Sequence, residues 1–116
     1  MSQFMFIYRD SKDPSTLSPE EMQADMEAWI GWINEAVAAG WMTNPGEALL
    51  PDSAATVRKD EVTDGPMIES KEIVGGFSII EAENLQAAIA LSQGCPAIAS
   101  GGCVEVRAVM VMPEGC

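Results

Sequence analysis

The sequence contains no histidine, and cysteine, the other common ligand of structural metals, is rare. Without histidine the chain cannot form a Ser–His–Asp triad, a histidine general base or a histidine metal site. Its three cysteines, Cys95, Cys103 and Cys116, include no CxxC pair, so the usual zinc sites and a disulfide framework are not expected. We therefore predict a protein without metal or cofactor in a reducing compartment, the cytoplasm.

Positive charge is also scarce, because 6 Lys and Arg stand against 18 Asp and Glu, a formal net charge of −12. Such a surface repels phosphate backbones and anionic lipids, so we expect neither nucleic acid nor membrane as a partner. We interpret the excess acid as a feature that favours solubility. The alternative is an acidic face that binds a basic partner protein.

Long apolar runs are absent, so neither a membrane span nor a signal peptide is predicted. The 116 residues, 47% hydrophobic and 21% charged, have the size and composition of one globular domain that spans residues 1–116.

The order of predicted elements begins with a short apolar strand at residues 4–8. Ser18 and Glu21 then form the two ends of a capping box around Pro19, which predicts a helix that ends at Gly40. The spacing of its apolar residues predicts one buried stripe, made of Met22, Met26, Trp29, Ile30, Ile33, Ala36 and Val37.

The second half of the chain predicts strands at residues 46–50 and 76–80, with a small hairpin over residues 55–63 between them. Asn84 caps a second helix that Gly94 and Pro96 end, and residues 104–112 form the last strand. With the hairpin counted as one element the order is β-α-β-β-β-α-β, which indicates an α+β, ferredoxin-like domain.

The first strand is apolar on both faces, because Phe4, Phe6 and Tyr8 alternate with Met5 and Ile7. Two helices can cover only one face of the sheet. A large exposed apolar face usually marks an interface, so we expect a homodimer in which two sheets stack.

Two charged clusters are candidates for chemistry. In the last strand, Glu105 and Arg107 share one face, where Arg107 could anchor an anionic ligand; a simple ion pair between the two is the alternative. Around the turn at residues 64–66, Asp64 and Glu69 could divide acid and base roles, and Lys71 could hold an anionic group. The alternative interpretation is that Asp64 is a turn residue bonded to its own backbone and that the other charges are solvated loop residues.

Aromatic residues supply the other candidates. Trp41, directly after the first helix, could wall a pocket, although core packing is favoured for each tryptophan. A concave pocket near Asp64, Tyr8 or Arg107 is where a small-molecule ligand would be expected. Cys103 has no histidine to activate it and is interpreted as structural.

Three motifs in order carry a family resemblance. DGPMIESKE at residues 64–72, followed by VGGF at 74–77, resembles the signature of the DGPF branch of the YCII-related proteins. GEAL at residues 46–49 and GCVEVR at 102–107 are similar to flanking segments of that branch. Met67 replaces the usual Phe, and Ala108 a frequent Pro.

The resemblance implies a dimeric α+β barrel. The best-known branch carries a His–Asp pair that this chain cannot have, and related proteins include a dehydrochlorinase-like enzyme of aromatic breakdown. Three functions follow as alternatives: an enzyme that transfers a proton or eliminates a group from a small polar organic substrate, an accessory or regulatory module associated with an extracytoplasmic-function sigma factor, and a domain with the fold but no site.

Overall fold

The computed structural model describes residues 1–10, 17–68 and 73–112. Its elements, in chain order, are β1 Ser2–Asp10, α1 Pro19–Ala38, β2 Met42–Asn44, β3 Ala55–Val57, β4 Val62–Asp64, β5 Ile73–Ala82, α2 Leu85–Ser92, α3 Pro96–Ala99 and β6 Cys103–Ala108. Four strands form an antiparallel sheet in the order β2-β5-β1-β6, while β3 and β4 form a separate hairpin. The predicted α+β, ferredoxin-like fold is confirmed.

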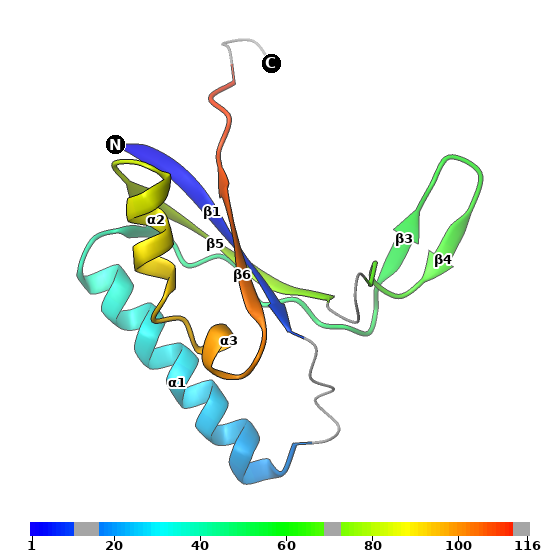
Figure 1. The fold of residues 1–116 in the computed structure, drawn as a ribbon. Helices are drawn as coiled ribbons and strands as arrows, with labels where there is room; N and C mark the ends of the chain where they lie inside the picture. The colour runs from blue at the N-terminus through cyan, green and yellow to red at the C-terminus, as the bar shows by residue number, and fades with distance from the viewer. Residues whose placement is uncertain (11–16, 69–72, 113–116) are drawn as a thin grey trace.

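All three helices lie on one side of the four-stranded sheet, and the β3–β4 hairpin projects away from the body on the other side (Figure 1). The predicted helix starts are present. The Ser18 hydroxyl accepts a hydrogen bond from the Glu21 backbone N–H at 3.1 Å, and the Asn84 side chain accepts one from the Ala87 N–H at 2.9 Å. Each cap satisfies a backbone donor that the helix itself leaves unpaired. Within the described ranges, no helix is both long and apolar enough to cross a membrane.

The alternation predicted for β1 is confirmed. Phe4, Phe6 and Tyr8 are buried beneath the helices, whereas Met5 and Ile7 on the opposite face are only partly covered. The registers align the same alternation in the neighbouring strands, so that Ile7 lies between Phe77 of β5 and Glu105 of β6. We call this opposite side the open face; its central apolar residues are Met5, Ile7, Phe77 and Ile79.

The core beneath the helices is centred on Phe6, which is fully buried. Its ring stacks on Trp32 at a centroid distance of 6.4 Å and lies 6.3 Å from Trp41 and 6.5 Å from Tyr8. Ile80, also fully buried, belongs to the same cluster. Aromatic packing thus joins the middle of the sheet to the second half of α1 and the residue that follows it.

Two predicted strands are wrong in part. Residues 46–50 form no strand and pair with β5 only through a bridge between Ala48 and Gly76, whereas β2, at Met42–Asn44, pairs with Ile79 and Ile80; the positive φ of Gly46 interrupts the extended chain between them. The last strand ends at Ala108 instead of residue 112, where its pairing with β1 stops at Phe4. The short α3 after Cys95 was not predicted; Pro96 begins it instead of only ending α2.

The predicted stripe of α1 is only partly buried, and that prediction is wrong for Met22, Met26, Ile30 and Val37, which are exposed. Ala36 is buried, but Met26 and Ile30 are 63% and 54% exposed. The helix contacts β2 and α3, whereas its N-terminal half stands away from β1 (Figure 1). This separation leaves space between α1 and the sheet.

Candidate functional site

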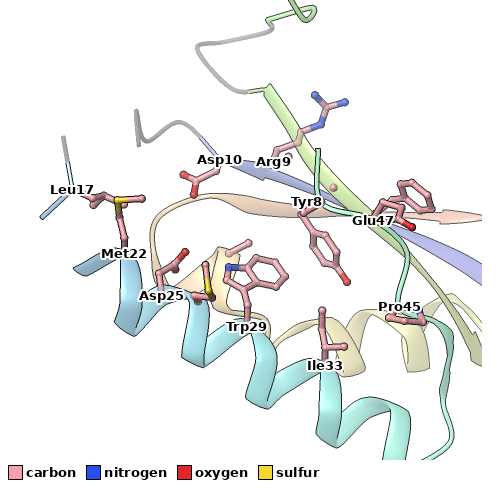
Figure 2. A pocket seen from close by; sticks show the side chains of 16 residues that line it. Tyr8, Arg9, Asp10, Leu17, Met22, Asp25, Trp29, Ile33, Pro45 and Glu47 are labelled. Carbon is pink, nitrogen blue, oxygen red and sulfur yellow. The ribbon is translucent and has the colours of Figure 1, made fainter. Parts of the chain in front are cut away.

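A cavity of about 440 Å³ lies between the N-terminal half of α1 and the ends of β1 and β5. That volume is in the range of small-molecule sites. The connector after β2 closes one side and α3 touches the cavity through Ala97. Figure 2 shows the side chains of β1, α1 and the connector around one space. We call this space the α1 pocket.

The α1 wall of the pocket comes from residues spaced three and four apart. Met22, Asp25, Met26, Trp29 and Ile33 all line it, because this spacing places them on one face of the helix. The exposure of the two methionines therefore has a structural reason: their side chains border a cavity and not a packed core. Met side chains adapt readily to ligands of different shape.

The connector wall is held against β5 by backbone contacts. The Phe77 N–H donates to the Glu47 carbonyl at 3.1 Å, and the Leu49 N–H donates to the Gly75 carbonyl at 2.8 Å. Gly46 has a positive φ of 67°, and a Cβ there would collide with the Phe77 carbonyl oxygen. This close approach fixes Pro45 and Glu47 at the rim of the pocket.

Tyr8 forms the floor of the pocket, and a chain of hydrogen bonds fixes its hydroxyl. Tyr8 Oη donates to Ser78 Oγ at 2.8 Å, and Ser78 Oγ donates to the Pro45 carbonyl at 2.8 Å. Burial raises the pKa of Tyr8, although the bond to Ser78 opposes the shift. The Tyr8 hydroxyl is thus held by Ser78, and Tyr8 lines the pocket as an aromatic side chain.

Trp29 stands over Tyr8, with ring centroids 4.8 Å apart and an interplanar angle of 75°. Its indole N–H makes no hydrogen bond with any residue in the described part of the chain and is not sealed from solvent or cavity. In Figure 2 the indole nitrogen points toward the end of the pocket that holds Asp25. An indole N–H is a donor only, so it can bind an acceptor atom of a ligand.

Two carboxylates, Asp10 from β1 and Asp25 from α1, line the same end of the pocket. Figure 2 shows them turned toward each other from the two walls. Within the described ranges, the Asp25 carboxylate makes no ion pair or hydrogen bond. The pocket thus combines a long apolar wall with an acidic end, here called the acid end.

Arg9 also borders the pocket, but its guanidinium points away from it (Figure 2). It lies on the open face, where Nη2 and Nε donate to Glu105 Oε1 at 3.1 and 3.2 Å. Arg107 donates to the other oxygen of Glu105 at 3.3 Å. The hydrogen bond from Arg9, supported by Arg107, lowers the pKa of Glu105.

The residues singled out in the sequence occupy different places. Tyr8 lines the α1 pocket, whereas Trp41 packs in the core 5.9 Å from the Trp32 ring and Asp64 ends β4 on the projecting hairpin. Glu105 and Arg107 form an ion pair on the open face. Of the proposed catalytic and binding residues that the structure describes, only Tyr8 lines the pocket; Glu69 and Lys71 lie outside the described residues.

Asp10, Asp25 and Trp29 were not identified as site residues from the sequence. Asp25 and Trp29 had a signal in the stripe of α1, because Asp25 interrupts an apolar face between Met22 and Met26, whereas no such pattern marks Asp10. Nothing local to the sequence shows that this face stands away from the sheet. Among the described residues, no three Cys, Asp or Glu side chains gather in a group suited to a metal ion.

Of the comparisons with known proteins, one gives a family and another a similar fold. A family model described as the YCII-related domain matches residues 3–113. A solved structure of 5-chloro-2-hydroxyhydroquinone dehydrochlorinase from Burkholderia phenoliruptrix, in complex with 2,5-dihydroxybenzoquinone, is similar with a TM-score of 0.50 and 19% identity over 90% of each chain. A search of the curated proteins finds no match.

Proposed function

This chain belongs to the YCII-related domain family, and from that premise we propose that its α1 pocket binds a small aromatic molecule and catalyses a proton-transfer step of the lyase type. The observation that carries the proposal is the pocket itself: two aromatic rings, a methionine wall and an acid end meet in one cavity. Aromatic walls with a few convergent polar groups are typical of small-molecule sites.

The structural neighbour supports the class of substrate. It acts on a chlorinated hydroxyhydroquinone and was solved with a dihydroxybenzoquinone, a flat six-membered ring with polar substituents. In the α1 pocket such a ring would lie against Trp29 and Tyr8, with its polar edge toward the acid end. The ring would pack against the two aromatic side chains, and its hydroxyl groups would donate hydrogen bonds to the carboxylates of the acid end.

Asp25 is the group best placed to accept a proton. It has no partner among the described residues, while the Tyr8 proton is committed to Ser78. In an elimination, the Asp25 carboxylate would take a proton from an acidic O–H or C–H of the substrate. The electron pair of the broken O–H or C–H bond would form the new double bond, and the bond to the leaving group would break so that this group departs as an anion with both electrons of that bond.

The test uses the Asp25→Asn variant, which keeps the size of the side chain but cannot accept the proton. Against a substrate found by screening halogenated and hydroxylated aromatic compounds, kcat should fall by about 10²–10⁴-fold while KM changes little. Glu35→Gln, an equal change of charge elsewhere on α1, should leave kcat unchanged. Full turnover by Asp25→Asn would remove this residue from the mechanism.

A homodimer of the DGPF type, a dimeric α+β barrel, is part of the same proposal. The open face carries Met5, Ile7, Phe77 and Ile79 in its centre, each only partly covered. Stacking against the same face of a second copy would remove this apolar area from water by a closed two-fold contact. The motif at residues 64–66 supports the assignment to the DGPF branch.

The alternative function is a regulatory module that binds an extracytoplasmic-function sigma factor. Its support is the family resemblance and the acidic surface, with a net charge of −12. A pull-down at low salt tests it, because an electrostatic complex is strongest there. Retention of the sigma factor without any turnover of small molecules would favour this alternative.

A further inference from the structure

The sheet separates the charges around the α1 pocket by sign. Carboxylates of Asp10 and Asp25 lie on the helix side, whereas the guanidinium groups of Arg9 and Arg107 lie on the open face. Both arginines are bound there by Glu105, at 3.1 and 3.3 Å. Because a strand directs successive side chains to opposite faces, neither guanidinium can reach the pocket without leaving its strand position.

The remaining cationic side chains of the described residues are also remote from the pocket. Arg58 and Lys59 follow β3 at the end of the projecting hairpin, where Arg58 pairs with Glu61 at 3.7 Å (Figure 1). Neither borders the cavity. Within the described ranges, therefore, the charged side chains whose ionised heads face the pocket are carboxylates.

The aromatic side chains of the pocket also favour a positively charged ligand. The Trp29 and Tyr8 rings meet edge to face at 4.8 Å, so a ligand beside them can lie over a π face. Such a face carries partial negative charge and attracts an ammonium or guanidinium group. A cationic head at the acid end would meet the Asp25 carboxylate as well, while an anionic head would be repelled by both features.

From this separation, and resting on the proposed function, we infer that the α1 pocket discriminates by charge: it binds aromatic amines in their protonated form most tightly, neutral aromatic compounds less tightly, and aromatic carboxylates least tightly. Asp25 is the residue that sets this order. Specificity of this kind comes from the groups that meet the ligand head, and not from the net charge of the chain.

The experiment compares three probes with the same ring: benzylamine, benzyl alcohol and benzoate. Their dissociation constants are measured by ligand-observed NMR at neutral pH with the full chain. Benzylamine should bind at least about tenfold more tightly than benzoate, with benzyl alcohol between them. Added salt should reduce the differences among the three dissociation constants, because the acid end is open to solvent and its charge is screened.

Variants assign the effect to the pocket. Asp25→Asn should reduce the preference for benzylamine over benzoate by at least about threefold and leave benzyl alcohol within twofold. Glu35→Gln removes one negative charge from the same helix outside the pocket, and the preference should not change. A shift of equal size in both variants would assign the effect to net charge and overturn the inference.

The outcomes separate this inference from the proposed function. Equal affinities for the three probes would leave a binding pocket without charge selection, and the inference would be wrong. Binding by none of them at millimolar concentration would overturn the proposed function and the inference together. Tighter binding of benzoate would contradict the inference alone.

Discussion

The two faces of the four-stranded sheet are made by alternate residues of the same strands, yet they are covered in different ways. On the helix side, Phe6 and Ile80 are fully buried by residues of this chain. On the open face, Ile7 and Phe77 lie opposite each other and remain partly exposed. The difference shows that one strand can supply both an internal core and a surface that needs a second layer.

The comparison also explains where the pocket lies. The helix side is filled where α2, α3 and the end of α1 pack, and it is open where the first half of α1 stands off β1 and β5. Cavity and core therefore share one face, and Tyr8 belongs to both.

The largest effect is expected at the centre of the helix side. Phe6→Ala removes a ring that contacts Tyr8, Trp32 and Trp41, and it should lower the free energy of unfolding by about 3–5 kcal/mol. Urea denaturation followed by tryptophan fluorescence measures the loss. The milder Phe6→Leu should stay folded and lose about 1–2 kcal/mol.

The exposed Val62 provides the control for this prediction. Its side chain is 65% exposed on the β3–β4 hairpin, so Val62→Ala should change stability by no more than about 0.5 kcal/mol. Equal losses for Phe6→Ala and Val62→Ala would mean that the aromatic cluster is not the centre of the core.

The next largest effect is expected on dimerisation through the open face. Ile7→Lys places a charge in its centre, next to Glu105, which can pair with the new ammonium group in a single copy. In the proposed homodimer the same charge would be buried, so the dimer dissociation constant should rise by about 100-fold or more. Sedimentation velocity at micromolar concentration measures the change.

Val57→Lys on the hairpin introduces the same charge away from the open face, at a side chain that is already 73% exposed. Its dimerisation should match that of the unmodified chain. If the unmodified chain itself sediments as a single copy, the proposed homodimer is wrong, whatever the variants do.

A smaller effect is expected where the pocket meets the core. Ser78→Ala leaves the Tyr8 hydroxyl without its acceptor and the Pro45 carbonyl without its donor, at a cost of about 1–3 kcal/mol. Combining it with Tyr8→Phe gives a double-mutant cycle, in which a coupling of about 0.5–1.5 kcal/mol would confirm the bond. Additive losses would show that the two groups act independently.

The smallest effect concerns pH and the open face. The hydrogen bond from Arg9 lowers the folded-state pKa of Glu105, so its contribution to stability is complete above the ordinary glutamate pKa, about 4.3. It is lost as the pH falls through the lower folded-state pKa. The stability difference between the unmodified chain and Glu105→Gln should therefore shrink on acidification, as thermal unfolding across that range would show.

Glu83→Gln is the control for this pH effect, because Glu83 is exposed and pairs with no cation among the described residues. The difference between that variant and the unmodified chain should stay small throughout the acid range. A Glu105→Gln difference that does not depend on pH would mean that the ion pair adds nothing to stability.

Local signals in the sequence predicted the elements that depend on neighbouring residues. The Ser18 capping box, the Asn84 cap and the alternation of β1 all appear in the structure, because each is decided within a few positions. The connector around Gly46 was predicted as a strand because its composition favours one. Its positive φ and its close approach to Phe77 are set by tertiary packing.

The pocket could not be derived from the sequence for a related reason. The spacing of Met22, Met26 and Trp29 shows that they share a helix face, but not how far that face lies from the sheet. A catalytic role was predicted for Asp64 because charged residues cluster around its turn, whereas the structure places it at the end of β4 on the hairpin. Asp64 lies near other charged residues in the sequence, but the fold places it on the hairpin, away from the pocket.

The way α1 is attached has a consequence for how the protein accommodates ligands of different size. The C-terminal part of the helix packs through Trp32, Ala36 and the contacts with β2 and α3, while Met22 and Met26 nearer its start border the cavity. A small tilt of α1 about this packed part would change the width of the pocket opening without unpairing a strand. Substitutions in this packed part of α1 would therefore change the range of ligand sizes that the pocket accepts, although they alter none of the polar groups that line it.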